Sequence, residues 1–464
     1  MHNASPETAL PPLPRREQFK ALGVASLGGM LEYFEFIIFI FLAPQITHHF
    51  SSADMPEWLR LTQTFGIFAA GFMIRPISGI LMAHLGDLVG RKRIFTLTLA
   101  LMAAPTLAIS VLPGYAEIGI WAPILLLACR ILQGISLGGE LPGAISFVSE
   151  QVSGRRLALA LCILTLSINL GSLLGSLVVS TLTHALGEKA MLEYGWRIPF
   201  MAGGLFGLVS VYLRRFTQET PVFEAMKSRL MLTARPPFAV LMAEHRFNLF
   251  AAMFVVASLT LITVAVQQFP ITYFVVLKHL PMAEISSLQS LLISCAMLGN
   301  IAGGLLVNWR LLSLRNAYIM LQLVAMVSLF WAYRQDTVEG IRLPFILLGL
   351  STGGYGALSL VLLARCFPAQ IRYTGLATCY NIPAALLGGT SLIVLTYLAR
   401  HSLDYPAFYP ALFCLLAIAA AILLWPRRHA INPFDADDPD ALPTAPFSSA
   451  IIRDMNRKAA PEQI

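Results

Sequence analysis

Long apolar stretches separated by short polar segments dominate the sequence. The apolar stretches are continuous rather than alternating at every second position, which excludes the strands of a β-barrel. A run of about 20 apolar residues can cross a bilayer as a helix, and a helix satisfies its own backbone hydrogen bonds there. We therefore predict an all-α integral membrane protein with twelve transmembrane helices, at residues 20–44, 62–86, 93–113, 119–148, 157–184, 198–214, 248–277, 286–308, 315–333, 343–365, 375–399 and 405–426.

Composition agrees with a chain that resides in lipid. Of its 464 residues 57% are hydrophobic and 12% are charged, whereas soluble domains carry about 25% charged residues. Residues 1–20 lack the short apolar core and small-residue cleavage site of a signal peptide, so we expect the first helix to remain as an anchor. The spacing of the six cysteines fits no metal site, and we predict no metal and no cofactor.

The positions of the basic residues predict the orientation. An even number of helices puts both termini on one side, and 23 of the 32 Lys and Arg residues fall in the tails and loops of that side. The opposite loops hold seven, and two lie inside predicted helices. Basic residues mark the cytoplasmic face, so both termini are predicted to be cytoplasmic. The net charge of +7 then reflects orientation in a lipid bilayer, not a nucleic-acid partner.

The longest internal loop divides the chain into two halves of six predicted helices, an arrangement expected of transporters built from repeats. The predicted organisation is a cytoplasmic N-terminal tail, a first six-helix bundle, a cytoplasmic linker, a second six-helix bundle and a disordered cytoplasmic C-terminal tail, at residues 1–19, 20–214, 215–247, 248–426 and 427–464 respectively.

A short basic turn follows the second predicted helix. Two glycines permit a tight turn and close helix approach. Asp87 can cap a helix start or bridge to a basic residue of the next element. We predict a gating motif, and the alternative is a topology signal only. Its residues are Gly86, Asp87, Gly90, Arg91, Lys92 and Arg93.

Acidic residues inside predicted helices are the candidates for proton coupling. Glu32 and Glu35 are three residues apart and share one face of the first helix. Acids within the membrane are functional candidates by default. Glu140, nearer the cytoplasm, is a third candidate, for a proton exit route, and its position favours the alternative of a gate network with Arg75 or the basic turn. For Glu32 and Glu35 the alternative is that one of them forms a static ion pair with an arginine of a neighbouring helix.

Polar residues on other predicted helices are candidates for substrate binding. A buried guanidinium stays charged and matches a carboxylate, which favours Arg75 and Arg130 as anion-binding groups or as partners of the acids. The second half offers neutral hydrogen-bonding groups, for which the alternative is packing between helices. The full predicted set is Arg130, Arg75, Gln133, Tyr33, Gln268, Tyr380 and Asn381.

Four segments in order resemble the major facilitator superfamily and, within it, the metabolite:proton symporters, which include permeases for proline and betaine, 2-oxoglutarate, citrate and shikimate. The resemblance covers roughly residues 20–426 and rests on Gly71 to Pro76 with the basic turn, Arg130 to Gly134 with Glu140, Gly195 to Phe200 with Glu219 to Phe223, and Ile371 to Gly375 with Tyr380 and Asn381. It implies that the turn latches the two halves on the inner side, and that Glu35 occupies a position where the family usually has Asp.

These features predict proton-coupled uptake of a small polar organic solute, a carboxylate or zwitterion, by alternating access. We expect a monomer in the bacterial inner membrane. An exporter or proton antiporter would use the same acids, and a nutrient sensor without transport is a more distant alternative. An enzyme is not expected, because the sequence has no metal motif, nucleophile elbow or phosphate-binding loop.

Overall fold

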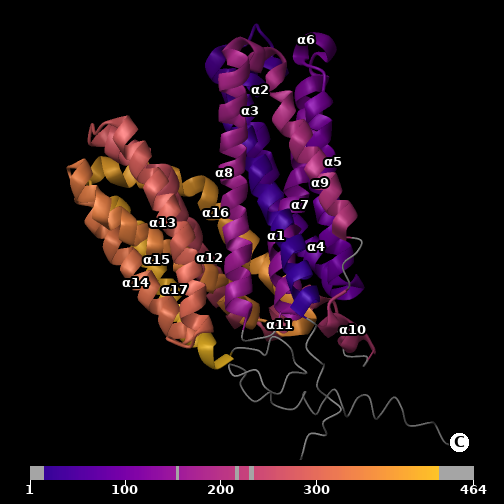
Figure 1. The fold of residues 1–464 in the computed structure, drawn as a ribbon, viewed down its shortest axis with the longest axis vertical. Coiled ribbons are helices and arrows are strands. Elements are labelled where there is room, and N and C mark those ends of the chain that lie inside the picture. Colours follow the sequence, from indigo (N-terminus) through magenta and orange to yellow (C-terminus); the bar gives the residue numbers. More distant parts are fainter. Residues whose placement is uncertain (1–14, 153–155, 215–218, 229–234, 428–464) are drawn as a thin grey trace, which may run out of the picture.

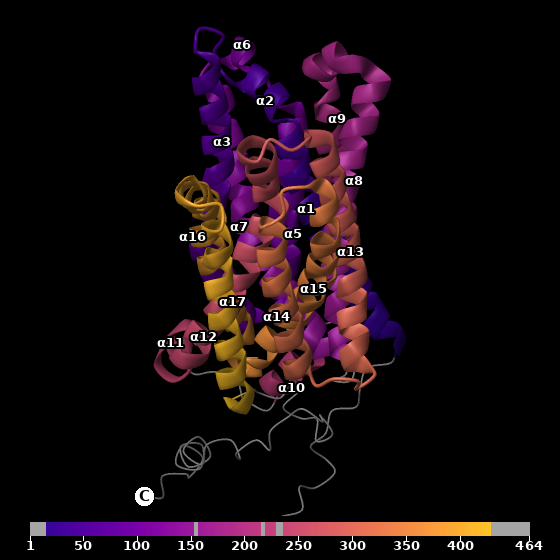
Figure 2. The same cartoon turned by 90° about the vertical axis from the view of Figure 1, so that its left-hand side faces the viewer.

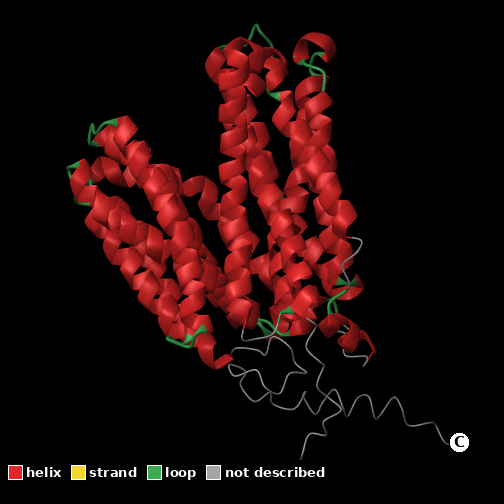
Figure 3. Ribbon diagram, viewed as in Figure 1, coloured by secondary structure: helices red, strands yellow, loops and turns green. Residues whose placement is uncertain are grey.

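The computed structural model describes residues 15–152, 156–214, 219–228 and 235–427. These residues form helices joined by short loops (Figure 3). The predicted disordered tail lies outside the described residues from position 428 onward, as do residues 1–14 and parts of the linker.

The helices fall into two groups, which Figure 1 shows diverging from a common end. The first bundle contains α1 (Arg15–Phe41), α2 (Ala43–Phe50), α3 (Glu57–Met73), α4 (Arg75–Val89), α5 (Arg91–Val111), α6 (Tyr115–Ile118), α7 (Trp121–Gln151), α8 (Leu157–Ala190), the π-helix η3 (Met191–Gly195) and α9 (Arg197–Arg214). Two short linker helices follow, α10 (Pro221–Ser228) and α11 (Pro237–Glu244).

The second bundle begins with α12 (Arg246–Thr263), which continues into two π-helical segments, η4 (Val264–Gln268) and η5 (Ile271–Leu277). The remaining elements are α13 (Met282–Asn308), α14 (Leu314–Tyr333), α15 (Val338–Arg365), η6 (Ala369–Ile371), α16 (Arg372–His401), α17 (Tyr405–Leu424) and η7 (Trp425–Arg427).

Each predicted membrane helix overlaps a helical segment of the structure. Ten helices of the described chain are long and apolar enough to cross a membrane, or eleven when the bent α16 is included as one span. The segment missing from this set is the 18-residue α9. The all-helical membrane fold is therefore confirmed, whereas the number twelve and the cytoplasmic termini remain predictions.

Several predicted helices are interrupted at identifiable residues. The span predicted at 62–86 is divided into α3 and α4 at Ile74, close to Pro76, which has no backbone N–H to donate. Gly187 has a φ of +79° and kinks α8 near its end. The α16 helix bends by 43° between Gly388 and Thr390. Such breaks do not change the order of spans along the chain.

The bundles meet along two lines of contact. The α16 helix packs against α4 and α7, and α13 packs against α8. Gly86 makes the first contact possible, because a Cβ atom there would overlap the ring of Tyr373 on α16. Both ends of the described chain lie at the same end of the molecule as α10 and α11 (Figures 1 and 2), so we call this end the linker side.

Candidate functional site

A small cavity lies inside the first bundle, midway along its helices. Its volume is about 20 Å³, which is enough for about one water molecule and too little for an organic solute. The lining residues come from α1, α3, α5 and α7 and are Glu32, Glu35, Phe68, Gly71, Phe72, Met102, Arg130, Gln133, Gly134 and Leu137. Four of the predicted site residues, both acids of α1 with Arg130 and Gln133, are thus brought together.

Glu35 is held by neutral donors. Its Oε2 atom accepts a hydrogen bond from the Thr106 hydroxyl on α5 and a longer one, of 3.4 Å, from Gln133 Nε2 on α7. Gln133 Nε2 also donates to Thr106 Oγ1 at 2.6 Å. The other carboxyl oxygen of Glu35 is buried and has no hydrogen-bond partner among the residues that the structure describes.

Arg130 lies 6% exposed beside this carboxylate without an ion pair in the described part of the chain. Its guanidinium carbon is 3.5 Å from the ring centroid of Phe39 and 6.0 Å from that of Phe68. Its Nε and one terminal nitrogen are buried and make no hydrogen bond to any described residue. The aromatic rings offset part of the desolvation of this cation, and its donors remain free for an anion.

Glu32 and Arg75 lie near the cavity, on the side of the first bundle that faces the second bundle. Glu32 is 4% exposed, with one oxygen unpartnered, and lies within electrostatic range of Arg75. Tyr380 of α16 lies within electrostatic range of Tyr33, Arg75 and Glu32. Groups from both bundles therefore approach one another at this level. We call Glu32, Glu35, Thr106, Arg130 and Gln133 the central cluster.

Glu140, the third predicted acid, is paired differently. Its Oε1 atom is 2.6 Å from Arg214 on α9, and its Oε2 atom accepts a hydrogen bond of 2.6 Å from Thr98. Arg214 also donates to the backbone oxygen of Phe95 and stacks on the Phe95 ring. Glu140 therefore pairs with Arg214, at the end of α9, and not with Arg75 or the basic turn, the partners that the sequence led us to expect. The Glu140 carboxylate is therefore part of a fixed pair within the first bundle.

Two predicted substrate residues lie elsewhere. Gln268 is exposed at the end of η4 and does not line the cavity. Asn381 is fully buried, and its Nδ2 atom donates to Gly138 O of α7 at 2.7 Å and to Ala377 O at 2.9 Å. In this conformation Asn381 joins the two bundles instead of facing an open site.

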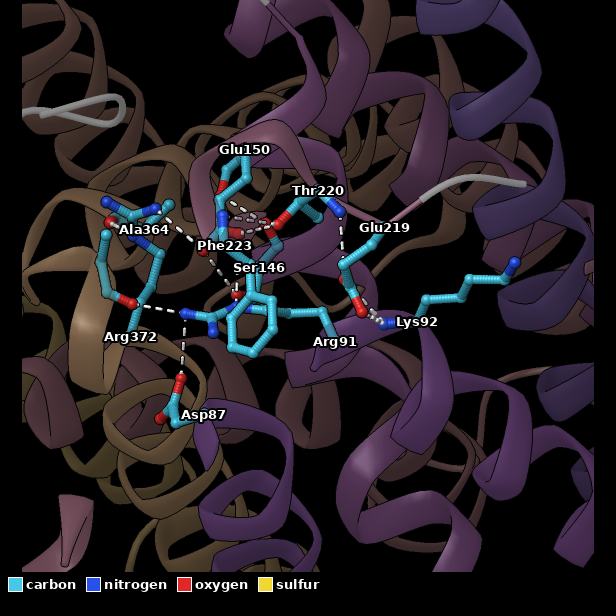
Figure 4. A network of polar contacts seen from close by, with 12 residues as sticks. Asp87, Arg91, Lys92, Ser146, Glu150, Glu219, Thr220, Phe223, Ala364 and Arg372 are labelled. Atoms are coloured by element: carbon cyan, nitrogen blue, oxygen red, sulfur yellow. Dashed lines mark hydrogen bonds and ion pairs between the residues drawn. The ribbon is translucent and has the colours of Figure 1, made fainter. Parts of the chain in front are cut away.

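The basic turn forms a buried ionic network at the linker side, shown in Figure 4. Arg91 lies 3.1 Å from Asp87 and 3.3 Å from Glu150, as ion pairs rather than aligned hydrogen bonds. Glu150 lies 3.3 Å from Arg372 of the second bundle. Arg91 also donates to the backbone oxygen of Ala369 in the second bundle. The side chains of all four charged residues are fully buried.

The linker adds a third component to this network. The Thr220 hydroxyl donates to Glu150 at 2.7 Å, and Phe223 of α10 lies under the Arg91 guanidinium. Glu219 accepts hydrogen bonds from the backbone nitrogens of Lys92 and Thr220. Burial raises the pKa of the Glu219 carboxyl above its ordinary value, and these two backbone donors oppose that shift. The linker thus covers the junction between the bundles. We call Asp87, Arg91, Glu150, Glu219, Thr220 and Arg372 the linker-side network.

Backbone contacts strengthen the same junction. The backbone nitrogen of Thr374 donates to Asp87 at 2.9 Å, near the start of α16, so Asp87 both pairs with Arg91 and caps a helix start. The Tyr373 hydroxyl donates to Gly139 O at 2.8 Å. Among the residues predicted for the gate, Lys92 is half-buried and Arg93 is exposed.

Sequence reasoning missed five important polar residues. Glu150, Arg214 and Arg372 stand at or just beyond the ends of predicted helices and resemble loop residues, yet each is buried. Thr98 and Thr106 are unremarkable threonines in an apolar helix. For Arg372 the available signal was its place in a segment of the family resemblance. The two threonines face acids of other helices only in the folded structure, and the sequence alone carried no signal for them.

The sequence matches the Major Facilitator Superfamily over residues 25–387. The chain belongs to this family. A Staphylococcus aureus (strain MSSA476) protein provisionally named a proline/betaine transporter is 32% identical over 407 residues, which cover 84% of each chain. The ectoine/proline transporter ProP of Corynebacterium glutamicum is 30% identical over 437 residues, 91% of this chain and 86% of its own.

Solved structures confirm the fold. The proton:xylose symporter XylE superimposes with a TM-score of 0.70 at 16% identity, covering 89% of this chain and 96% of XylE. FucP in its outward conformation gives a TM-score of 0.65 at 16% identity, over 88% and 99% of the two chains. This major facilitator protein is therefore a secondary transporter of the bacterial inner membrane with a small-molecule substrate, and it is not an enzyme.

Proposed function

We propose that this transporter takes up a small zwitterion or carboxylate together with a proton by alternating access. The supporting observation is the central cluster, where, among the described residues, Arg130 has no ion pair and two acids retain unpartnered oxygens. A zwitterion carries one charge of each sign, so it can satisfy both kinds of group at once. The bacterial relatives named for proline, betaine and ectoine agree with this class of solute.

The solute would bind between the bundles, beside the cavity and not inside it. The cavity of about 20 Å³ admits water only. Glu32, Arg75 and Tyr380 lie where the first bundle faces the second. In the proposed mechanism Arg130 or Arg75 receives the carboxylate of the solute, Glu32 receives its cationic group, and Glu35 carries the proton.

The conformational step would be a rocking of residues 20–214 against residues 248–426. With twelve spans and cytoplasmic termini, the linker side is the cytoplasmic side, and the linker-side network closes it in the conformation described above. Proton binding from outside and solute binding would precede opening of this network and release inside. The membrane potential contributes about 2.3 kcal/mol per charge per 100 mV. We propose that a monomer suffices.

The decisive experiment is uptake into proteoliposomes under an imposed inward proton gradient. Labelled proline, glycine betaine and ectoine form the zwitterion panel, with 2-oxoglutarate and a neutral sugar for comparison. We expect accumulation of at least one zwitterion or carboxylate, abolished by a protonophore. Glu35→Gln should retain exchange of that solute across the membrane and lose accumulation driven by the gradient.

The measured direction of solute transport and its coupling to protons can each contradict the proposal. If the gradient accelerates uptake of none of the charged solutes, the proposed symport is wrong. If the protein instead extrudes solute in exchange for protons, it is an antiporter of the same fold. If Glu35→Gln keeps full accumulation, another group carries the proton.

A further inference from the structure

Two threonines of α5 hydrogen-bond to two different acids, and the surroundings of the acids differ. Thr98 donates to Glu140, whose other oxygen is paired with Arg214 at 2.6 Å. Thr106 donates to Glu35, whose other oxygen has no partner in the described chain. The first acid is held in an ion pair with a guanidinium, whereas the second can exchange a proton without breaking an ion pair.

The Thr106 hydroxyl has two acceptors and a single proton. Its oxygen lies within hydrogen-bond distance of Glu35 Oε2 and also 2.8 Å from the backbone oxygen of Met102. A hydroxyl has one donor and two acceptor sites, so it cannot donate to both oxygens together. The Gln133 amide donates to the same hydroxyl oxygen at 2.6 Å in either case.

The two possible hydrogen-bond patterns correspond to the two protonation states of Glu35. When Glu35 is charged, Thr106 donates to Oε2, and Gln133 donates to Thr106. When a proton is bound at Oε2, Glu35 becomes the donor to Thr106 Oγ1. The hydroxyl then rotates and donates to Met102 O instead. In both states Thr106 Oγ1, Gln133 Nε2 and Glu35 Oε2 each have a hydrogen-bond partner, and the change requires only a rotation of the hydroxyl.

We propose that Thr106 is a hydroxyl switch that accompanies proton binding and release at Glu35, with Gln133 as the residue that positions it. The proton itself arrives at and leaves Oε2 through the cavity, and Thr106 keeps its own proton throughout. The switch rests on the proposed role of Glu35 and assigns to α5 a part in coupling that the sequence did not indicate.

The charged groups around Glu35 are consistent with this assignment. Glu32 faces it from α1 and Arg130 from α7. The charged residues of α5, α8 and α9 stand near the ends of those helices, and α9 contributes Gly203 next to Glu35. Neutral hydrogen-bond donors therefore provide the adjustable part of the environment, while Arg130 provides a constant charge.

The test follows the carboxyl group directly and needs no substrate. Infrared difference spectra of the purified transporter between acidic and alkaline buffer record the C=O stretch of protonated carboxyls, and Glu35→Gln identifies the band of Glu35. In Thr106→Val the charged form of Glu35 loses its donor, so the midpoint of this band should move to higher pH by about one unit. Thr106→Ser should stay close to the unmodified protein.

Thr98→Val is the matched control, because it removes the same hydroxyl from the same helix beside an acid that is paired with arginine. We expect it to leave the Glu35 band unchanged. If Thr106→Val does not fold, Thr106→Ala removes the same hydroxyl with less constraint on its shape. The switch is overturned if the Glu35 band has the same midpoint with and without the Thr106 hydroxyl, or does not titrate at all. Loss of solute accumulation with an intact shift would instead contradict only the proposed symport.

Discussion

The central cluster and the linker-side network are both buried and contain charged side chains. The charges are paired in the network, whereas several are unpaired in the central cluster. In the network Arg91 and Arg372 share Glu150, and Asp87 pairs with Arg91. In the central cluster Arg130 has no ion pair within the part of the chain that the structure describes, and Glu32 and Glu35 each keep one oxygen without a partner there. Charges that are paired across two bundles hold those bundles together. Charges left unpaired in a buried site cost stability and are available to a ligand.

Buried arginines and acids therefore have two different roles in this protein: those of the network hold the bundles together, and those of the central cluster are available to the solute. Removing one member of the network leaves its partner as an uncompensated buried charge. Removing the unpaired Arg130 relieves the protein of a buried charge while depriving the solute of its partner. Substitution in the linker-side network should therefore lower the stability of the protein, whereas substitution of Arg130 should reduce transport without loss of stability.

The largest effect is expected for Glu150→Ala. Arg91 and Arg372, both fully buried, would lose the acid that lies between them, and breaking a buried ion pair in this way costs about 3–5 kcal/mol. Thermal unfolding in detergent measures the loss. The double variant Glu150→Ala/Arg372→Leu should lose less than the sum of the two single changes. A loss below about 1 kcal/mol, the range of an exposed pair, would contradict the conclusion that this network holds the two bundles together.

The second prediction concerns Arg130→Met, which replaces the guanidinium by an apolar chain of similar length. We expect the free energy of unfolding to be unchanged or raised by about 1 kcal/mol, because no ion pair is broken. Uptake of the transported solute should fall by at least about 100-fold, as expected when a charged partner is lost from a buried site. Arg130→Lys, which keeps the charge without the planar fork, is the control and should retain intermediate uptake.

The comparison between the two sites fails if Arg130→Met destabilises the protein as severely as Glu150→Ala. Such a result would mean that the stacking of Arg130 on Phe39 and Phe68 holds the first bundle together. It would also remove the basis for assigning Arg130 to the solute.

The sequence determines the path of the chain better than it determines its charge pairs. Continuous apolar runs located the helices within a few residues, because the length of a membrane helix is set by the bilayer. Which arginine meets which acid depends on helix rotation and on the contact between bundles, and hydropathy reports neither. Arg214, at the last position of a predicted helix, turns inward to Glu140, and Arg372 pairs with an acid 222 positions earlier in the chain.

The candidate site was predicted in part for the same reason. Glu32, Glu35 and Arg130 stand out because charges inside an apolar helix are rare and need a purpose. Thr106 does not stand out, since a threonine in a membrane helix can satisfy its hydroxyl on its own backbone. Only the packing of α5 beside α1 and α7 reveals that its hydroxyl has a second acceptor.

The smallest predicted effect lies at the edge of the network, in Glu219→Gln. Because burial raises the folded-state pKa of Glu219 above the ordinary value of 4.5, the folded protein binds this proton more tightly than the unfolded chain does. The contribution of Glu219 to stability is therefore present at low pH and is lost as the pH rises through the folded-state pKa. Glutamine is neutral at every pH, and its side-chain oxygen can still accept from the backbone nitrogens of Lys92 and Thr220.

The stability of Glu219→Gln relative to the unmodified protein should consequently increase with pH above 4.5, by less than about 1 kcal/mol since the group is partly exposed to solvent. Thermal unfolding of both proteins across a pH series measures the difference, and Glu224→Gln on the exposed face of α10 serves as a control with no expected trend. A variant that becomes relatively less stable as the pH rises would show that the Glu219 charge stabilises the junction. In that case Glu219 would act in the same way as Glu150, and the stabilising charges of the network would include one from the linker.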